Sequence, residues 1–403
     1  MNEVIFYGMM VMLICFGVAT FFLSRIPSEI FDDEYDVGLD PLLPVFGSML
    51  LGAIGVLFFF NEQADAINDY GYWDFILPFI LGGLIYFCYM LNIGMITNIV
   101  IFASALLMSF IQPDDFYLEL GELSVWQERI VIAIVIFIIT KGLSLLNGLG
   151  GVGALQVLAV LIVGTIMAYF GALPILLGYV ALAYCGAIGA FLSFSFPPEK
   201  LVITNGGWGA IGFVLASFML YGCTEQAEVS MIIACSYLFT EVGIALYNRV
   251  ILNKKRELGY MYTYYWEIAN EDEYDKPVVI GVMKIFFIDM LLALFQLVAY
   301  ERIALLVFAF AINLWMLQVL KGEAEPLRFF SITRWSANKV KGIFRGDEEQ
   351  SFEVVDEKKT EEVEVEDIPY KKVKKSPKKN SKTSTKEKSK KTSKLSKKNE
   401  KTK

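Results

Sequence analysis

The sequence contains no histidine, and charged residues make up only 19% of its 403 positions. Without an imidazole side chain, the chain can have neither a histidine base nor a histidine metal ligand. The cysteines show no paired metal-binding or redox spacing, so we expect packing residues and not a disulfide framework or a thiolate cluster. The cysteines, which lie mostly in apolar segments, are Cys15, Cys88, Cys185, Cys223 and Cys235.

Apolar residues dominate what is present: 56% of the chain is hydrophobic and 14% is aromatic. This composition is typical of a polytopic membrane protein. Apolar runs long enough to cross a hydrocarbon core of about 30 Å as helices occur about eleven times. They lie near residues 4–24, 42–60, 75–92, 94–112, 128–146, 152–171, 174–194, 207–222, 228–247, 277–298 and 302–320. We therefore predict an all-α, polytopic integral membrane protein with about eleven transmembrane helices.

The distribution of Lys and Arg predicts the orientation in the membrane. The first apolar run is followed by the acidic sequence FDDEYD and not by a cleavage site, so we expect it to stay as an anchor. With the N-terminus outside, only Arg129 and Arg302 lie on the outer side. Because the number of predicted spans is odd, we expect the C-terminus to be cytoplasmic. We expect the membrane to be an inner or plasma membrane. The basic residues of the inner loops are Arg25, Lys200, Arg249, Lys254, Lys255, Arg256 and Lys276.

Three regions follow from the composition. Residues 1–330 form the transmembrane domain, 331–370 an acidic cytoplasmic linker, and 371–403 a tail that alternates Lys with Ser, Thr and Asn. The tail has too little apolar surface to offset its chain entropy, so we expect disorder. Its lysines would bind anionic lipid or nucleic acid, or would stay solvated without a specific target.

One segment carries a resemblance to a known family. Residues 196–213, FPPEKLVITNGGWGAIGF, resemble the loop FPPAKIFMGDSGSLFLGF of the polyprenyl-phosphate N-acetylhexosamine-1-phosphate transferases, the membrane family that includes MraY and WecA. Asn205 stands where the family has its acidic residue. The positions that agree with the family are Pro197, Pro198, Lys200, Gly207, Gly212 and Phe213.

Four further segments resemble motifs of that family in the same order. Residues 42–48, LLPVFGS, are similar to PTPRLGG, and residues 83–91, GLIYFCYML, are similar to GFIDDLLDL. Residues 141–153, KGLSLLNGLGGVG, are similar to NAINLIDGLDGLA, and residues 262–267, YTYYWE, to HLHHRL. The family's acidic and histidine positions are occupied here by Tyr86, Phe87, Asn147, Gly150, Tyr262, Tyr264 and Tyr265.

The resemblance implies a scaffold that has lost its chemistry. The family transfers a sugar phosphate from a UDP-sugar to a lipid phosphate with the help of magnesium, and magnesium sites are usually built with carboxylates. We therefore expect a catalytically degenerate, lipid-phosphate-binding, scaffolding or regulatory protein near envelope-glycan assembly. We expect no metal and no cofactor, or Mg²⁺ if the protein is active. The expected partners are membrane lipid, polyprenyl phosphate as a candidate, and a membrane protein.

The residues proposed for a residual ligand site are Lys141, Lys200, Asn205 and Glu241. A purely structural interpretation of these segments also stays open. Glycine-rich segments are common where membrane helices pack closely. Glu241 lies inside an apolar run, where a carboxylate is costly and usually faces a partner or an aqueous cavity.

Two other functions stay open. A divergent but active transferase would need one of the acids Glu199, Glu241 and Glu267 to converge on Lys200 and Asn205. A transporter would need Lys141, Glu241 and Asp289 to line a path through the bilayer. Structural pairs, Lys141 with Glu241 or Lys284 with Asp289, would instead neutralise these charges without any ligand.

Overall fold

A computed structural model describes residues 2–26, 40–60, 72–111, 124–146, 151–196, 201–222, 228–250, 275–298 and 302–321. The chain divides into two units, Met1–Ser336 and Ala337–Lys403, and every described residue belongs to the first. The acidic linker and the Lys-rich tail both lie entirely outside the described residues. Also outside them are Asn147, Gly150, Glu199, Lys200, Tyr262, Tyr264, Tyr265 and Glu267.

All regular structure in the described part of the chain is α-helical, which confirms the all-α prediction. Each apolar run coincides with helix to within a few residues. The helices are α1 (Asn2–Leu23), α2 (Leu42–Phe59), α3 (Tyr72–Met90), α4 (Gly94–Ile111), α5 (Val125–Leu145), α6 (Val152–Tyr169), α7 (Ile175–Ser195), α8 (Asn205–Gly222), α9 (Glu228–Ala234), α10 (Ser236–Val250), α12 (Asp275–Gln296) and α13 (Arg302–Lys321).

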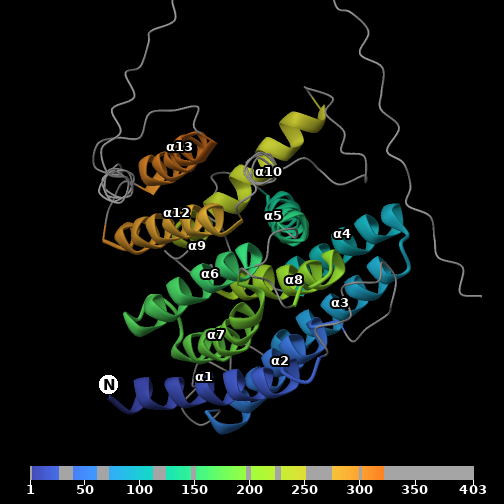
Figure 1. Ribbon diagram of the computed structural model, residues 1–403, viewed down its shortest axis with the longest axis vertical. Coiled ribbons are helices and arrows are strands. Elements are labelled where there is room, and N and C mark those ends of the chain that lie inside the picture. Colours follow the sequence, from blue (N-terminus) through green and yellow to red (C-terminus); the bar gives the residue numbers. More distant parts are fainter. Residues whose placement is uncertain are drawn as a thin grey trace, which may run out of the picture. The chain divides into compact units, whose positions relative to one another are not determined.

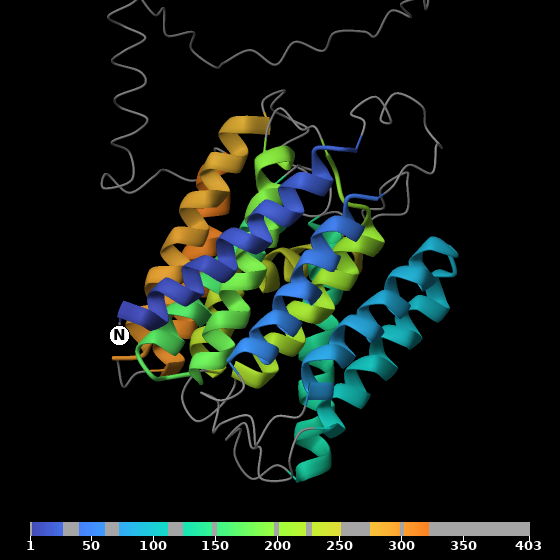
Figure 2. The ribbon, with the colours of Figure 1, turned by 90° about the horizontal axis from the view of Figure 1, so that it is seen from below.

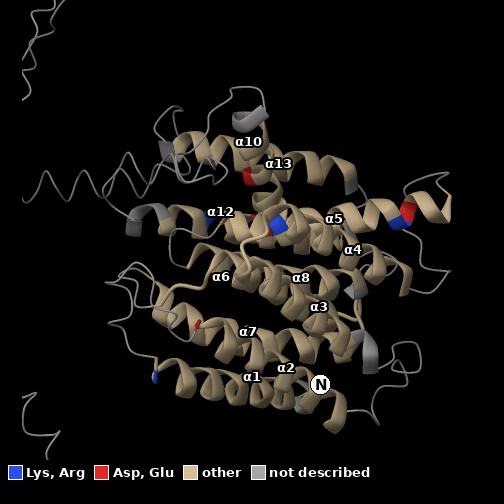
Figure 3. Ribbon diagram, turned by 90° about the vertical axis from the view of Figure 1, so that its right-hand side faces the viewer, with Lys and Arg blue, Asp and Glu red and all other residues tan. Residues whose placement is uncertain are grey.

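Six of these helices are long and apolar enough to cross a membrane: α1, α2, α4, α6, α7 and α12. Helices α3, α8 and α13 contain shorter apolar stretches. Large apolar side chains face outward as well; Phe58 is 77% exposed and Met95 is 78% exposed. The ribbon in Figure 3 is accordingly uncharged over most of the length of its helices. Such a surface is suited to lipid and not to water, so the protein is membrane-embedded.

One prediction about the helices was wrong. The apolar run at 228–247 is not a single helix, because α9 ends at Ala234 and α10 begins at Ser236. The amide of Cys235 still donates to the carbonyl of Met231 at 3.1 Å, and the carbonyl of Cys235 accepts from Phe239 at 3.1 Å. Cys235 therefore closes one helix and opens the next.

The most buried helices lie at the centre of this first unit. Helices α6, α7 and α8 separate α1 and α2 on one side from α12 and α13 on the other (Figures 1 and 2). Helices α1 and α2 pack on α7, α3 and α5 pack on α8, and α12 packs on α6 and α9. Small residues allow the closest crossing, since a Cβ at Gly186 would collide with the backbone oxygen of Met12 on α1.

The packing role predicted for the cysteines is confirmed where the structure describes them. Cys15, Cys88, Cys185 and Cys235 are all buried. Cys223 lies outside the described residues.

Candidate ligand pocket

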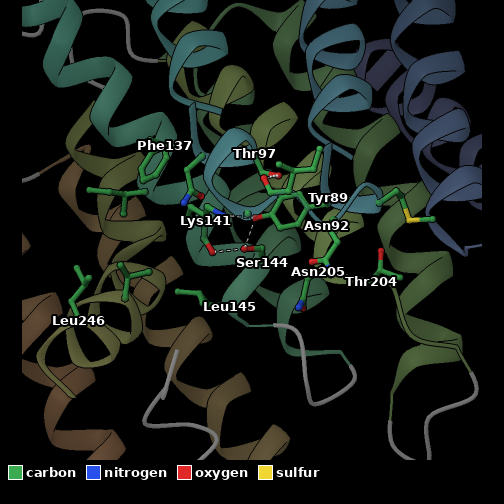
Figure 4. Close-up of a pocket in the computed structure, with 17 residues that line it drawn as sticks. Tyr89, Asn92, Thr97, Phe137, Lys141, Ser144, Leu145, Thr204, Asn205 and Leu246 are labelled. Carbon is green, nitrogen blue, oxygen red and sulfur yellow. Dashed lines mark hydrogen bonds between the residues drawn. The ribbon is translucent and has the colours of Figure 1, made fainter. Parts of the chain in front are cut away.

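A pocket of about 660 Å³ opens where α3 ends, α4 begins, α5 ends and α8 begins, with α10 along one wall. It brings together Lys141 and Asn205, two of the four residues predicted for a residual ligand site (Figure 4). Lys200, the third, lies outside the described residues. The polar residues of the lining are Tyr89, Asn92, Thr97, Asn98, Lys141, Ser144, Thr204 and Asn205.

Lys141 is held by a short chain of hydrogen bonds. Its ammonium donates to the hydroxyl of Tyr89 at 2.8 Å, and that hydroxyl donates to Ser144 Oγ at 3.2 Å. Ser144 Oγ in turn donates to the backbone carbonyl of Lys141 at 2.8 Å. Because an ammonium carries three donors and Tyr89 takes one, the half-buried Lys141 keeps donors for a ligand in the pocket.

The first turn of α8 forms the opposite wall. Thr204 precedes this helix and acts as its N-cap, since its Oγ1 accepts from the amide of Gly207 at 3.2 Å. The first bond along the helix axis runs from the amide of Trp208 to the carbonyl of Thr204, at 3.0 Å. The amides of Asn205 and Gly206 come before that bond, at the end of the helix that carries partial positive charge.

A second helix begins at the same pocket. The amide of Thr97 donates to the carbonyl of Ile93 at 2.9 Å, which is the first bond of α4. Both residues and Gly94 line the pocket. The turn before α4 is closed by Asn92, whose φ of 53° lies in the left-handed region that Asn tolerates better than most residues. The first turns of α4 and α8 therefore both face this space.

Lys141 and the two helix N-termini place positive charge at the pocket, and one carboxylate, that of Asp40, lies behind the lining residue Thr204. Among its described lining residues, Lys141 is the only charged side chain, and none is a carboxylate. Helix N-termini together with a lysine are a common arrangement for binding phosphate or carboxylate. In the part of the chain that the structure describes, no group of three His, Cys, Asp or Glu side chains could hold a metal ion. The described lining is therefore suited to an anionic ligand.

Sequence reasoning missed Asp40, which organises one edge of the site. Its carboxylate accepts from the amide of Leu42 at 2.9 Å, from the hydroxyl of Tyr86 at 3.1 Å and from Thr204 Oγ1 at 2.8 Å. It therefore joins the start of α2 to α3 and to the cap of α8. The local signal was visible, because Asp followed by Pro41 is a typical helix start; the distant partners left no such signal.

The two residues that the resemblance aligns with acidic positions, Tyr86 and Phe87, lie in different surroundings. Tyr86 is half-buried and donates to Asp40. Phe87 is 58% exposed on the apolar outer surface. Neither residue lines the pocket described here. Tyr86 therefore supports the edge of the site through Asp40, whereas Phe87 faces outward.

Glu241, the fourth predicted site residue, lies beside the pocket but not in its described lining. Its side chain is 1% exposed and accepts from the hydroxyl of Tyr237 at 3.0 Å, one turn earlier on α10. The next residue, Val242, contributes to the pocket wall. Lys141 and Glu241 each bond a tyrosine hydroxyl, and the direct pairing of the two charges stays a prediction.

A second polar cluster surrounds the break between α9 and α10. The carboxylate of Asp289 on α12 accepts from Asn313 Nδ2 at 3.2 Å, and it also bonds the side chain of Ser236 and the backbone of Tyr237. Asn313 Nδ2 also donates to Ser236 Oγ, at 2.9 Å. On the other side of the break, Gln156 Nε2 donates to the carbonyl of Ala234 at 2.9 Å. These side chains supply partners to the helix ends that the break creates.

Comparison with protein-family models gives no match, and neither does comparison with curated proteins. The chemistry of the pocket must therefore support any assignment of function.

Proposed function

We propose that this membrane protein binds the phosphate group of a polyprenyl phosphate in the Lys141 pocket and does not transfer sugar phosphate. In this proposal the chain is a degenerate relative of the polyprenyl-phosphate N-acetylhexosamine-1-phosphate transferases and keeps their multi-helix scaffold. The observation that supports it is the convergence of Lys141 and the first turns of α4 and α8 on one pocket without a described carboxylate.

The same observation argues against transfer chemistry. Transfer to a lipid phosphate needs a metal that neutralises charge on the bridging oxygens, and magnesium usually takes one or two carboxylates. Asn205 offers a neutral amide at the key position. Asp40, the nearest described carboxylate to Thr204, already accepts three hydrogen bonds from the protein. We propose with it a scaffolding or regulatory role near envelope-glycan assembly, with a membrane protein partner.

Lipid access supports a lipid ligand over a soluble anion. Apolar residues at the pocket are exposed on the outer surface: Met90 by 53%, Ile93 by 40% and Leu246 by 45%. They provide a surface for an isoprenoid chain beside the polar site. With about eleven spans and the N-terminus outside, as the basic loops predict, the pocket would lie at the cytoplasmic face. Binding of the Lys-rich tail to anionic lipid or nucleic acid remains part of this proposal.

Binding of undecaprenyl phosphate to the detergent-purified full chain tests the proposal directly. Lys141→Gln should weaken binding about ten- to a hundredfold, since a charge-assisted hydrogen bond contributes about 1.5–3 kcal/mol. Lys321→Gln, a matched substitution at the end of α13, should leave the affinity unchanged. Equal affinity of Lys141→Gln and the unmodified protein would contradict binding in this pocket.

A transfer assay tests the second half of the proposal. The same protein with undecaprenyl phosphate, Mg²⁺ and either UDP-GlcNAc or UDP-MurNAc-pentapeptide should give no product. An Asn205→Asp variant, run in parallel, asks whether one restored acid is sufficient. Turnover by the unmodified protein would instead establish a divergent transferase, with Glu199, Glu241 or Glu267 as the acids to substitute first.

A further inference from the structure

A groove runs between α1 and α2 on the far side of α7 from the Lys141 pocket. The two helices lie side by side and both pack on α7 (Figure 2). Two adjoining cavities of about 350 and 250 Å³ lie between them and share the lining residues Val18, Ser48 and Leu51. The first cavity reaches Arg25, just beyond the end of α1, and the second reaches Phe59 at the end of α2.

The groove has only two polar side chains of note in its described lining, and they differ in depth. Arg25 is exposed at one end, where its guanidinium carbon lies 4.9 Å from the ring centroid of Phe21. Ser48 is 2% exposed and lines both cavities. Within the described structure its Oγ is buried without a hydrogen-bond partner. A buried hydroxyl without a partner is costly, so this atom points to a missing acceptor.

Glycines keep the groove open. A Cβ atom built on Gly47 or on Gly55 would meet no heavy atom within 4 Å, although both residues line the cavities. The helices touch between these two positions, where a Cβ on Gly52 would lie 2.7 Å from the sulfur of Cys15. The space above Gly47 and Gly55 is therefore open to an occupant and not filled by the neighbouring helix.

We propose that this groove binds one glycerophospholipid from the surrounding membrane. Its phosphate is held by Arg25, an ester carbonyl accepts the hydrogen bond of Ser48, and an acyl chain lies along Leu51 and Gly55. The order of these groups along the groove is their order in the lipid, with the phosphate at the interface, the ester below it and the chain in the apolar core. Arginine suits phosphate in both charge and geometry. A polyprenyl phosphate has no ester carbonyl, so the buried hydroxyl of Ser48 favours a diacyl lipid.

Native mass spectrometry of the delipidated full chain, titrated with dioleoyl phosphatidylglycerol, tests this site. The unmodified protein should bind one lipid more tightly than any others. Gly47→Leu places a side chain in the groove from a position where a Cβ meets no heavy atom within 4 Å, and it should weaken that first event at least tenfold. Gly83→Leu on α3, where a Cβ also meets nothing within 4 Å, is the matched control and should bind normally. Equal binding by Gly47→Leu and the control would overturn the proposal.

Two more variants identify the groups of the lipid. Ser48→Ala should weaken phosphatidylglycerol about three- to tenfold, as expected for one hydrogen bond, and should leave undecaprenyl phosphate unaffected. Arg25→Gln should abolish the preference for phosphatidylglycerol over dioleoylglycerol. If Gly47→Leu weakens undecaprenyl phosphate and Ser48→Ala weakens neither lipid, the occupant is the polyprenyl lipid and the proposal fails. Lys141→Gln should not change phosphatidylglycerol binding, so the outcome here is independent of the proposed function.

Discussion

The Lys141 pocket and the cluster at the break between α9 and α10 use similar polar residues for different purposes. At the break, Asp289, Asn313 and Gln156 are fully buried and bond either the ends of the two helices or one another. In the pocket, the ammonium of half-buried Lys141 donates to Tyr89, whose hydroxyl donates to Ser144, beside a space of about 660 Å³. The break cluster bonds mainly the helix ends and its own members, although one oxygen each of Asp289, Asn313 and Gln156 is buried without a hydrogen-bond partner within the described structure. The Lys141 side chain, in contrast, lies beside an open space.

The difference shows how to interpret a charge within a membrane helix. A buried carboxylate is costly, and in a membrane it usually marks a functional site. Asp289 has another sufficient role, because the break in the helix exposes amides that need an acceptor and the bilayer core offers no water. Lys141 has no comparable task for the backbone of another helix. The ionisable residue next to an open pocket is therefore the better candidate for ligand binding.

The largest expected effect comes from breaking the closed cluster. Asp289→Ala removes the acceptor for Tyr237, Ser236 and Asn313, and we expect it to lower the free energy of unfolding by about 2–4 kcal/mol. Thermal unfolding of the detergent-purified protein measures this change. Asp289→Asn, which keeps an acceptor oxygen, should lose less. Equal stability of Asp289→Ala and the unmodified protein would show that the break does not depend on α12.

The sequence predicted most helices because hydrophobic length is a local property. The apolar runs identified eleven stretches that all contain helix, but continuous hydropathy concealed the break at Cys235. The groups that stabilise the break come from Gln156 on α6, Asp289 on α12 and Asn313 on α13. Their distance in sequence left no pattern to recognise. A local signal cannot predict a break that is stabilised by other helices.

The Lys141 pocket, like the helices, was predicted only in part. The family resemblance placed Lys141 and Asn205 in motifs that belong together, and the structure brings both to one pocket. Tyr89, which bonds Lys141, carried no signal because an aromatic residue at the end of an apolar run is ordinary. The sequence marks Asp40 only as the start of a helix. It was overlooked as a site residue because its bonds to Tyr86 and Thr204 exist only in the fold.

The packing that shapes the pocket should be sensitive to a single methyl group. A Cβ on Gly206 would lie 2.7 Å from Cβ of Tyr89, so Gly206→Ala must displace Tyr89 or the start of α8. We expect a loss of about 1–3 kcal/mol in stability, as for other overpacked sites, and weaker binding of undecaprenyl phosphate. Gly83→Ala adds the same methyl group in open space and should change neither quantity. If both variants behave alike, close packing at Tyr89 is not required.

Removing one hydroxyl separates packing from the orientation of Lys141. Tyr89→Phe keeps the ring against Gly206 and Gly209 but removes the bonds to Lys141 and Ser144. The expected loss of stability is about 1 kcal/mol, near that of an ordinary hydrogen bond. Affinity for undecaprenyl phosphate should fall severalfold, because the ammonium is no longer held toward the pocket. An affinity equal to that of the unmodified protein would mean that Lys141 needs no positioning by Tyr89.

The smallest effect on stability is expected at Lys141 itself, where the comparison with the break is sharpest. Lys141→Gln removes a half-buried charge that donates to one tyrosine hydroxyl, and Gln keeps an amide donor at this position. We expect the free energy of unfolding to stay within about 0.5 kcal/mol of the unmodified value, as for most substitutions away from a critical contact. Asp289→Ala, measured beside it, should be much less stable. A large loss of stability in Lys141→Gln would show that this lysine stabilises the fold. Lys141 would then no longer support an anionic ligand in the pocket.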